Sequence, residues 1–288
     1  MKGWLITNKY YVSSNLLVLK DILIESSKRF DIDLTCYNNI EILNILSDSN
    51  YKKPDFVLFW DKDVKLASYL ESENIRVFNR SDSIKNCDDK SLTYLKLRNK
   101  NIKMPKTIFS PLMYYHDIYK DKEYIDYILN NLSFPFVYKE CYGSFGKQVY
   151  LINDKNELID RIKKSDTWPF EMQELVKSSF GKDIRVYVVG NEIVGGMKRI
   201  NKNGDFRANL EIGGVSEKYN LNDKQAEMAL TVVSELKLDF AGVDILFGEN
   251  EEPVLCEVNS NAFFIGFNKT LNLNVADYIF KHIVKTLS

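Results

Sequence analysis

Residues 239–248, Asp-Phe-Ala-Gly-Val-Asp-Ile-Leu-Phe-Gly, and residues 253–261, Pro-Val-Leu-Cys-Glu-Val-Asn-Ser-Asn, are the part of the chain that decides its fold. They contain two apolar runs, Val243 to Phe247 and Pro253 to Val258, separated by the polar turn Gly248 to Glu251. This pattern predicts two paired strands.

Three oxygen-bearing side chains lie in these two runs. Side chains at positions i and i+2 of a strand share a face, so Glu257 and Asn259 project together, and a paired strand brings Asp244 beside them. Oxygen ligands without sulfur or imidazole suit Mg²⁺. The alternative is a hairpin with solvated acids, but both acids interrupt apolar runs, where an unpaired carboxylate is costly. The sequence therefore predicts a metal site at Asp244, Glu257 and Asn259.

Composition limits the possible partners. The net charge is −1, so no overall field draws the chain to nucleic acid or to an anionic membrane. No 18-residue apolar run and no signal-peptide pattern are present, so we expect a cytoplasmic protein without a membrane span. A homo-oligomer is possible, although core packing is the simpler use of the tyrosines and phenylalanines.

Cysteine and histidine usage excludes other chemistries. Cys36, Cys87, Cys141 and Cys256 are scattered, which favours free thiols in a reducing compartment. His116, in a polar connection, and His282, in a helical pattern, are the only histidines of the sequence. We therefore expect neither a zinc site nor a His-based nucleophile system.

The first part of the chain alternates strand and helix, which predicts a small parallel sheet. It carries no glycine-rich dinucleotide turn. The expected strands are 4–7, 32–37, 56–60 and 76–78, the expected helices are 16–30, 64–73 and 90–99, and residues 79–88 are expected to form a link with turn or cap residues at 81–83.

The pattern changes from about Thr107. The expected strands there are 134–139, 148–152, 171–176, 184–189 and 192–197, and the expected helices are 123–131, 156–164, 221–236 and 275–286. The class is therefore α/β (α+β), with two or three lobes.

A glycine loop, Gly143-Ser144-Phe145-Gly146, lies between two expected strands. Glycines let backbone amides approach an anion, and Lys139 lies just upstream. An ordinary hairpin loop is an equally weighted alternative. The loop is not a Walker A motif, because Cys141 and Gln148 stand where that motif needs Gly and Ser or Thr.

Other candidates are weaker when taken singly. The strand with Glu171 and Glu174 can hold an adenine by its backbone, but edge strands often carry exposed acids. Asp183 and Arg185 share a strand face, where a surface ion pair worth little is the alternative. Arg207, in Gly204-Asp205-Phe206-Arg207-Ala208-Asn209, suits phosphate or carboxylate recognition, and a solvated turn is the rival.

The order of these pieces resembles the ATP-grasp superfamily, and within it the RimK-type glutamate ligases. The blocks that carry the resemblance are 181–190, 204–214, 241–246 and 257–259. The resemblance implies an ATP-grasp fold with a pre-ATP-grasp βαβ lobe at 1–86 and an ATP-grasp domain at 87–288. Within that domain it implies a small central lid lobe at about 107–175 and an antiparallel C-terminal lobe at about 176–288.

The resemblance also implies roles for single residues. Lys90 and Lys139 would contact the ATP phosphates, Glu174 and Leu175 the adenine, and Asp183 the ribose. The candidate nucleotide-binding residues are Lys90, Lys139, Gly143, Ser144, Gly146, Glu174, Leu175, Asp183, Arg207, Ala208 and Asn209. Arg207 and Asn209 would sit at the γ-phosphate, and Asp244, Glu257 and Asn259 would bind two Mg²⁺, with Mn²⁺ as a possible substitute. The candidate catalytic residues are Lys139, Arg185 and Arg207, and the candidate substrate-binding residues are Arg199, Ser260 and Asn261.

The implied reaction is ATP-dependent amide formation through an acyl phosphate. An amino acid such as glutamate would be added to a peptide, a protein or a small molecule. The chain departs from the family pattern at two places. Residues 260–264, Ser-Asn-Ala-Phe-Phe, stand where the family has a small residue followed by Ser, Pro and Gly, which bears on substrate choice. Lys147-Gln148 stands where the family has a further glycine, which bears on the motion of the glycine loop. The alternatives are a noncatalytic ATP-binding regulatory module and a kinase that stops at phosphate transfer.

Overall fold

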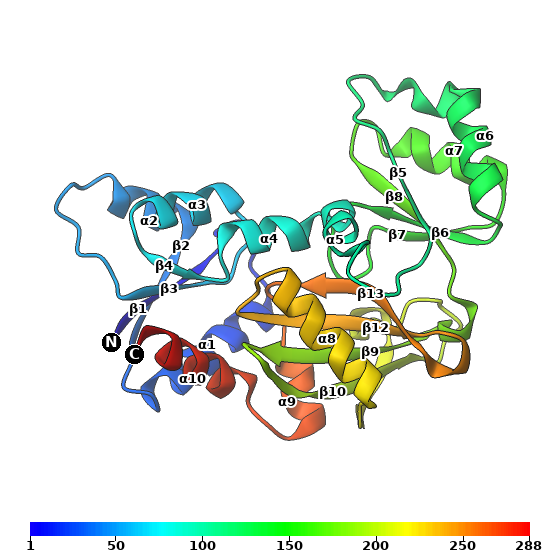
Figure 1. Ribbon diagram of the computed structural model, residues 1–288. Coiled ribbons are helices and arrows are strands. Elements are labelled where there is room, and N and C mark those ends of the chain that lie inside the picture. The colour runs from blue at the N-terminus through cyan, green and yellow to red at the C-terminus, as the bar shows by residue number, and fades with distance from the viewer.

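Three β-sheets form the frame of the protein in the computed structural model (Figure 1). The structure describes residues 1–288, except for the side chain of His116. The expectation for His116 therefore falls outside the described residues. The predicted mixed α/β architecture of three lobes is confirmed, with a parallel sheet first and two antiparallel sheets after it.

The N-terminal lobe holds a four-stranded parallel sheet in the order β2-β1-β3-β4. Its strands are β1 (Lys2–Thr7), β2 (Asp33–Asn38), β3 (Phe56–Phe59) and β4 (Arg76–Phe78), and its helices are α1 (Ser14–Lys28), α2 (Asn39–Leu46) and α3 (Val64–Ser72). Leu16, Leu19 and Leu23 recur at helical spacing and are buried, so α1 presents one apolar face to the sheet.

The central lobe is a four-stranded antiparallel sheet in the order β5-β8-β6-β7, with its helices on one face (Figure 1). The strands are β5 (Thr107–Phe109), β6 (Phe136–Glu140), β7 (Val149–Ile152) and β8 (Phe170–Glu174), and the helices are η1 (His116–Lys120), α6 (Lys122–Asn131) and α7 (Lys155–Lys164). Phe136, Tyr138, Phe170 and Met172 pack against the helices. The alternate residues of β6 and β8 therefore point away from them.

The C-terminal lobe is a five-stranded antiparallel sheet in the order β11-β10-β9-β12-β13. The strands are β9 (Lys182–Val189), β10 (Glu192–Asn201), β11 (Gly214–Tyr219), β12 (Phe240–Phe247) and β13 (Pro253–Asn259). The other elements are η2 (Lys177–Ser179), η3 (Leu210–Ile212), α8 (Asp223–Glu235), η4 (Glu249–Glu251), α9 (Ile265–Leu271) and α10 (Val275–Leu287).

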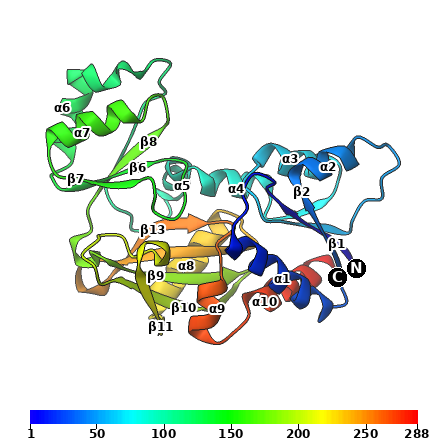
Figure 2. The same ribbon diagram turned by 180° about the vertical axis from the view of Figure 1, so that it is seen from behind.

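Helix α8 covers one face of this sheet, where Val186, Val188, Val243 and Ile245 pack against it. The opposite face carries Tyr187 and Phe240, which join the core shared with α1 and α10. Figure 2 shows α1 and α10 side by side, with the two chain termini close together. Among the described helices, none is long and apolar enough to cross a membrane.

Several elements differ from the sequence predictions. The expected link 79–88 is wrong, because Ser81–Asp88 forms α4, in which Ile84 and Cys87 are buried although most of the segment is polar. It leads into α5 (Lys90–Leu97). The sequence patterns also missed α2, β5, β11 and α9, all of which are short, so their stability depends on the elements they pack against.

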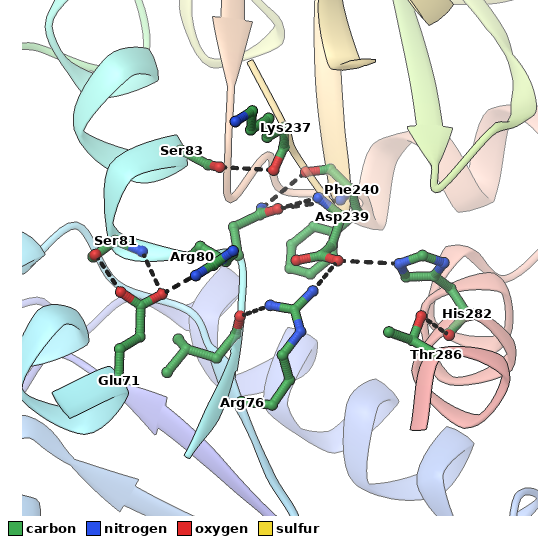
Figure 3. Close-up of polar contacts among 12 residues, drawn as sticks. Glu71, Arg76, Arg80, Ser81, Ser83, Lys237, Asp239, Phe240, His282 and Thr286 are labelled. Carbon is green, nitrogen blue, oxygen red and sulfur yellow. Dashed lines mark hydrogen bonds and ion pairs between the residues drawn. The ribbon is translucent and has the colours of Figure 1, made fainter. Parts of the chain in front are cut away.

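A polar contact joins β4 of the N-terminal lobe to the five-stranded sheet of the C-terminal lobe (Figure 3). Arg76 Nη2 donates to Asp239 Oδ1 at 2.6 Å, and His282 Nε2 lies 3.2 Å from the same oxygen.

The next residue after β4, Asn79, is 1% exposed and forms hydrogen bonds with both backbone groups of Phe240. Its Nδ2 also donates to Ser260 O at 2.6 Å. Asn79 therefore joins the start of β12 to the segment that follows β13.

Candidate active site

A cleft of about 780 Å³ opens between the central lobe and the C-terminal lobe. Residues from both antiparallel sheets line it, although many of them are far apart in sequence. The predicted site residues that line the cleft are Lys90, Lys139, Gly146, Glu174, Leu175, Asp183, Arg199, Arg207, Ala208, Asn209, Asp244 and Glu257. Tertiary folding thus brings most of the sequence-derived candidates to one place.

Strand register aligns the charged residues on the cleft side of the C-terminal sheet. Arg185 lies opposite Asp244, and Asp244 lies opposite Glu257. Arg199 on β10 lies opposite Asp183 on β9. Residues that alternate with these along β9 and β12 pack against α8, so the strand period of two separates the charged face from the apolar core.

The pairing among these charges differs from the sequence expectation. An ion pair between Asp183 and Arg185 along one strand was the alternative interpretation, but each residue binds a partner on a neighbouring strand instead. Arg199 donates from Nε to Asp183 Oδ1 at 2.7 Å and from Nη2 to Asp183 Oδ2 at 2.6 Å. Arg185 donates from Nε and Nη2 to the carboxylate of Asp244, the latter bond being 2.8 Å long. A planar guanidinium matches a carboxylate that directly faces it across two strands.

Asp244 is shared by two arginines, because Arg199 Nη2 also lies 3.0 Å from its Oδ2. Asp244 is 3% exposed. Burial alone would raise the pKa of Asp244, but Arg185 and Arg199 outweigh burial and hold that pKa below its usual value. The carboxylate of Asp244 is therefore anionic and can neutralise the charge of a positively charged ligand.

Gly242 makes room for this arrangement. A Cβ atom at Gly242 would lie 3.0 Å from Arg185 Cδ and 2.6 Å from the Cβ of Ala262. Any side chain at this position would push Arg185 away from Asp244 or displace the segment after β13. The glycine in Ala-Gly-Val-Asp thus serves the packing of the site.

Glu257 and Asn259 share one face of β13, as predicted, and Glu257 is adjacent to Asp244. Lys90 Nζ lies 3.3 Å from Glu257 Oε1. Burial raises the pKa of Glu257, but Lys90 counteracts it and the net pKa lies below the ordinary value. Over the described residues, no three His, Cys, Asp or Glu side chains form a metal-binding group. Two carboxylates and an amide nevertheless fit Mg²⁺, which takes few protein ligands and completes its shell with water and phosphate oxygens.

Lys139 and Glu171 lie directly opposite each other on β6 and β8. Lys139 is 7% exposed and Glu171 is 1% exposed. Lys139 lines the main cleft, and Glu171 lines an adjoining cavity of about 330 Å³ together with Lys90 and Glu257. The sequence marked the strand of Glu171 only as one interrupted by acids, which did not single out this residue.

The glycine loop between β6 and β7 is held from three sides. Arg207 Nη1 donates to Gly146 O at 2.7 Å, Lys90 Nζ donates to Gly143 O at 3.4 Å, and Lys62 Nζ donates to Ser144 Oγ at 3.3 Å. Gly146 has a φ of +70°, and a Cβ there would lie 2.8 Å from Asn209 Oδ1. The conformation and the close approach both require glycine.

Lys62 is a site residue that sequence patterns missed. It follows β3 at the carboxyl edge of the parallel sheet, and its Nζ also lies 2.6 Å from Asp88 Oδ1. Residues at the carboxyl edge of an α/β sheet commonly face ligands. The position of Lys62, just after a predicted strand of the parallel sheet, could therefore have marked it as a candidate site residue.

The cleft lining also includes apolar side chains that the sequence patterns did not single out, namely Val137, Val149, Val176, Phe180, Phe206 and Leu246. Glu174 and Leu175 line the same cleft, and apolar side chains of this kind commonly line the sites that bind aromatic ligand rings.

The remaining predicted residues lie outside the cleft lining. Gly143 and Ser144 belong to the glycine loop, and Arg185 lies beside Asp244 on the neighbouring strand β9 and donates to its carboxylate. Asn259 ends β13 opposite Gly242, Ser260 is 3% exposed, and Asn261 follows it half-buried. Phe263 contacts Tyr11 and Phe145, with ring centroids 6.5 and 6.0 Å apart, so three lobes meet at this segment.

Comparison with known proteins agrees with this geometry. Residues 87–283 match the family described as the RimK-like ATP-grasp domain. The chain belongs to the RimK-like ATP-grasp family. The predicted family is therefore confirmed, and the match covers both lobes that line the cleft.

Relatives of this RimK-like protein include proteins with functional names. Human N-acetylaspartylglutamate synthase A is 34% identical over 79% of this chain and 57% of its own length. The chain thus spans little more than half of that synthase. A probable alpha-L-glutamate ligase 1 of Shewanella oneidensis is 35% identical over 75% of this chain and 69% of the relative. An uncharacterised Mycoplasma pneumoniae protein is 34% identical, with 78% of each chain covered.

Solved structures share the fold. The ATP complex of D-alanine–D-alanine ligase from Bacillus anthracis matches 100% of this RimK-like chain and 97% of its own, with a TM-score of 0.75 and 18% identity. The ligase PsnB, solved with a phosphomimetic variant of a minimal precursor, Mg and ADP, matches 99% of this chain and 98% of its own, with a TM-score of 0.69 and 14% identity. The predicted ATP-grasp fold is confirmed. The predicted enzyme class is confirmed too: the chain is an ATP-dependent ligase that forms C–N bonds.

Proposed function

We propose that this ligase joins the amino group of an amino acid such as glutamate to the carboxylate of a small molecule, a peptide or a protein. ATP would first phosphorylate the carboxylate. The amine would then displace phosphate from the acyl phosphate. The names of the synthase and ligase relatives support glutamate as the amine.

The observation that carries the proposal is the convergence in one cleft of two lysines and two carboxylates, which are the proposed phosphate and metal ligands. Lys90 and Lys139 come from α5 and β6, while Asp244 and Glu257 come from β12 and β13. Phosphoryl transfer needs positioning and charge neutralisation more than covalent help from the protein. The cleft offers both kinds of group without a nucleophilic Ser or Cys system.

Each residue has a role in the proposed reaction. Lys90 and Lys139 bind the phosphates, and Glu174 and Leu175 present backbone to the adenine. Asp183 lies near the ribose, and Arg207 and Asn209 lie at the γ-phosphate beneath the glycine loop. Mg²⁺ held by Asp244, Glu257 and Asn259, as two ions in the presence of ATP, would supply further charge neutralisation.

The proposed reaction exchanges bonds in two steps. A carboxylate oxygen of the substrate attacks the γ-phosphorus, and the bond to ADP breaks. The amine nitrogen then attacks the acyl carbon, phosphate leaves, and the amine releases its proton. Closure of the loop at Gly143–Gly146 over the cleft excludes water, which would otherwise hydrolyse the acyl phosphate. Arg185 and Arg199 hold the negative charge of Asp244 in place during the reaction.

Substrate selection is proposed at the three-lobe junction. Asn261 and Phe263 follow the metal-binding strand, and Tyr11 and Phe145 lie close to Phe263. The departure from the family pattern in this segment therefore lies where two other lobes contribute aromatic rings. The carboxylate substrate of this chain would differ accordingly from that of enzymes with the Ser-Pro-Gly pattern.

The test is ADP release with ATP, Mg²⁺ and a panel of carboxylates, with hydroxylamine as a surrogate amine. ADP together with a matching hydroxamate would support the acyl phosphate and name the carboxylate. Glutamate in place of hydroxylamine should then give an amide. A stable phosphorylated product without amide would instead favour the kinase alternative, and ATP binding without turnover on any carboxylate would favour the noncatalytic alternative.

A further inference from the structure

Glu171 is a buried carboxylate that the proposed reaction does not use. It is 1% exposed, and its Oε2 atom is buried without a hydrogen-bond partner. Burial of an unpaired carboxylate oxygen is costly, so an apolar residue would be the more stable choice in the middle of β8. The position therefore calls for an explanation.

Three charged groups lie near this carboxylate. Lys139 lies directly opposite Glu171 in the β6–β8 pairing, which places their Cβ atoms about 5 Å apart. Lys90 and Glu257 line the same cavity as Glu171, and Lys90 Nζ lies 3.3 Å from Glu257 Oε1. Two ammonium groups and two carboxylates thus balance to zero charge.

Nucleotide binding changes this balance. Under the proposed function, Glu257 turns to Mg²⁺ and the two lysines turn to phosphate oxygens. Glu171 then remains as a carboxylate behind the lysines, on the same face of the sheet. Its negative charge opposes the retention of an anionic phosphate chain, because charges in a poorly hydrated site interact strongly over several ångströms.

We propose that Glu171 is the counter-ion of Lys90 and Lys139 in the nucleotide-free site, and that it limits how tightly the site holds ADP. The inference rests on the proposed function of the cleft. Glu171 acts through the two lysines and is therefore a positioning residue, with its effect expressed in nucleotide affinity and release.

The electrostatics of the neighbouring groups are consistent with this role. Burial raises the pKa of Glu171, and Lys139 and Lys90 only partly counteract that rise. Burial would lower the pKa of Lys90, but Glu257 and Glu171 keep that pKa above its usual value. Glu171 thus helps to keep a buried lysine charged before any phosphate arrives.

The first experiment measures ADP binding to Glu171→Gln by calorimetry, with and without Mg²⁺. Glutamine keeps the shape and removes the charge, so we expect about tenfold tighter ADP binding, a gain that salt should change little because Glu171 is buried. Both kcat and the KM for ATP should fall, because ADP leaves more slowly. Glu171→Asp keeps the charge and should bind ADP as the unaltered chain does.

A control separates the local effect from a change in net charge. Glu217, on the exposed edge strand β11, has a side chain that is 59% exposed, so Glu217→Gln should leave ADP affinity unchanged. Because Glu171→Gln leaves the buried Lys90 and Lys139 with one carboxylate fewer, it should melt somewhat lower than the unaltered chain, and its ADP affinity is compared at a temperature where it is folded.

Equal or weaker ADP binding by a folded Glu171→Gln protein would overturn the counter-ion role, and weaker binding would show that Glu171 instead orients Lys139. The unaltered chain would still bind ADP in that case, so the proposed function would stand. A lack of ADP binding by the unaltered chain would overturn both.

Discussion

Arg185 and Asp244 face each other across β9 and β12, and Arg185 Nη2 donates to Asp244 Oδ2 over 2.8 Å. Arg199 approaches the same oxygen to 3.0 Å. The carboxylate proposed to bind metal is thus already held by two cations. This arrangement fixes its position before ligand arrives, and it couples the stability of the sheet to the charge of the site.

Replacement of Asp244 should affect both activity and stability. Asp244→Ala should remove most metal-dependent turnover and should destabilise the fold by about 3–5 kcal/mol, because it leaves the buried Arg185 without a carboxylate and Arg199 with Asp183 alone. Asp244→Asn keeps the volume and should also lose turnover. ADP release and urea unfolding measure the two effects. Near-normal turnover in either variant would exclude Asp244 as a metal ligand.

Lys139 should contribute mainly to the chemical step. Lys139→Ala should reduce kcat by about 10²–10³, as expected for loss of one preorganised electrostatic donor. Lys164, exposed at the end of α7, provides the control, and Lys164→Ala should retain full activity. If both variants had the same kcat, the phosphate-binding role of Lys139 would be wrong.

Gly146 should be intolerant of any side chain. Gly146→Ala combines a φ of +70° with a 2.8 Å approach to Asn209 Oδ1, so we expect a raised KM for ATP and a lower kcat. Gly204 has a φ of +82°, and a Cβ atom added there would meet nothing within 4 Å, so Gly204→Ala measures backbone strain alone. Equal losses in the two variants would show that the contact with Asn209 has no role.

Cysteine reactivity should report the integrity of the cleft. Burial raises the pKa of Cys256 and that of Cys141 to about 12 each. At pH 8 about one thiol in 10⁴ is then a thiolate, since each pH unit below the pKa lowers the thiolate fraction tenfold. Iodoacetamide should label neither residue in the folded protein at pH 8 and should label both in urea, as mass spectrometry can show. Labelling would become fast only as the pH approaches 12, and rapid labelling of folded Cys256 at pH 8 would contradict this environment.

Asn79 should stabilise the junction between the first lobe and the C-terminal lobe. Asn79→Ala removes hydrogen bonds to Phe240 and Ser260 and leaves buried backbone groups unpaired, so we expect a loss of at least about 2 kcal/mol in the free energy of unfolding. Asn44 is exposed on α2, and Asn44→Ala should cost almost nothing. Urea unfolding of the two variants tests the difference, and equal stabilities would mean that the junction does not depend on Asn79.

The sequence by itself determined the strand pair around Asp244, Glu257 and Asn259, because two short apolar runs flank a polar turn. It also determined the parallel N-terminal sheet and, through four ordered motifs, the family. The strands are local in sequence and the pattern of apolar residues encodes them directly, whereas the order of the four motifs encodes the family.

Only the tertiary structure decided which charges meet. Asp183 pairs with Arg199 and not with Arg185, because antiparallel register places the partners on neighbouring strands. Lys62 reaches Ser144 from another lobe, and Glu171 lies opposite Lys139 only after β6 and β8 pair. Such contacts depend on register and on lobe packing, which are set by the burial of distant apolar faces and leave no fixed spacing in the sequence.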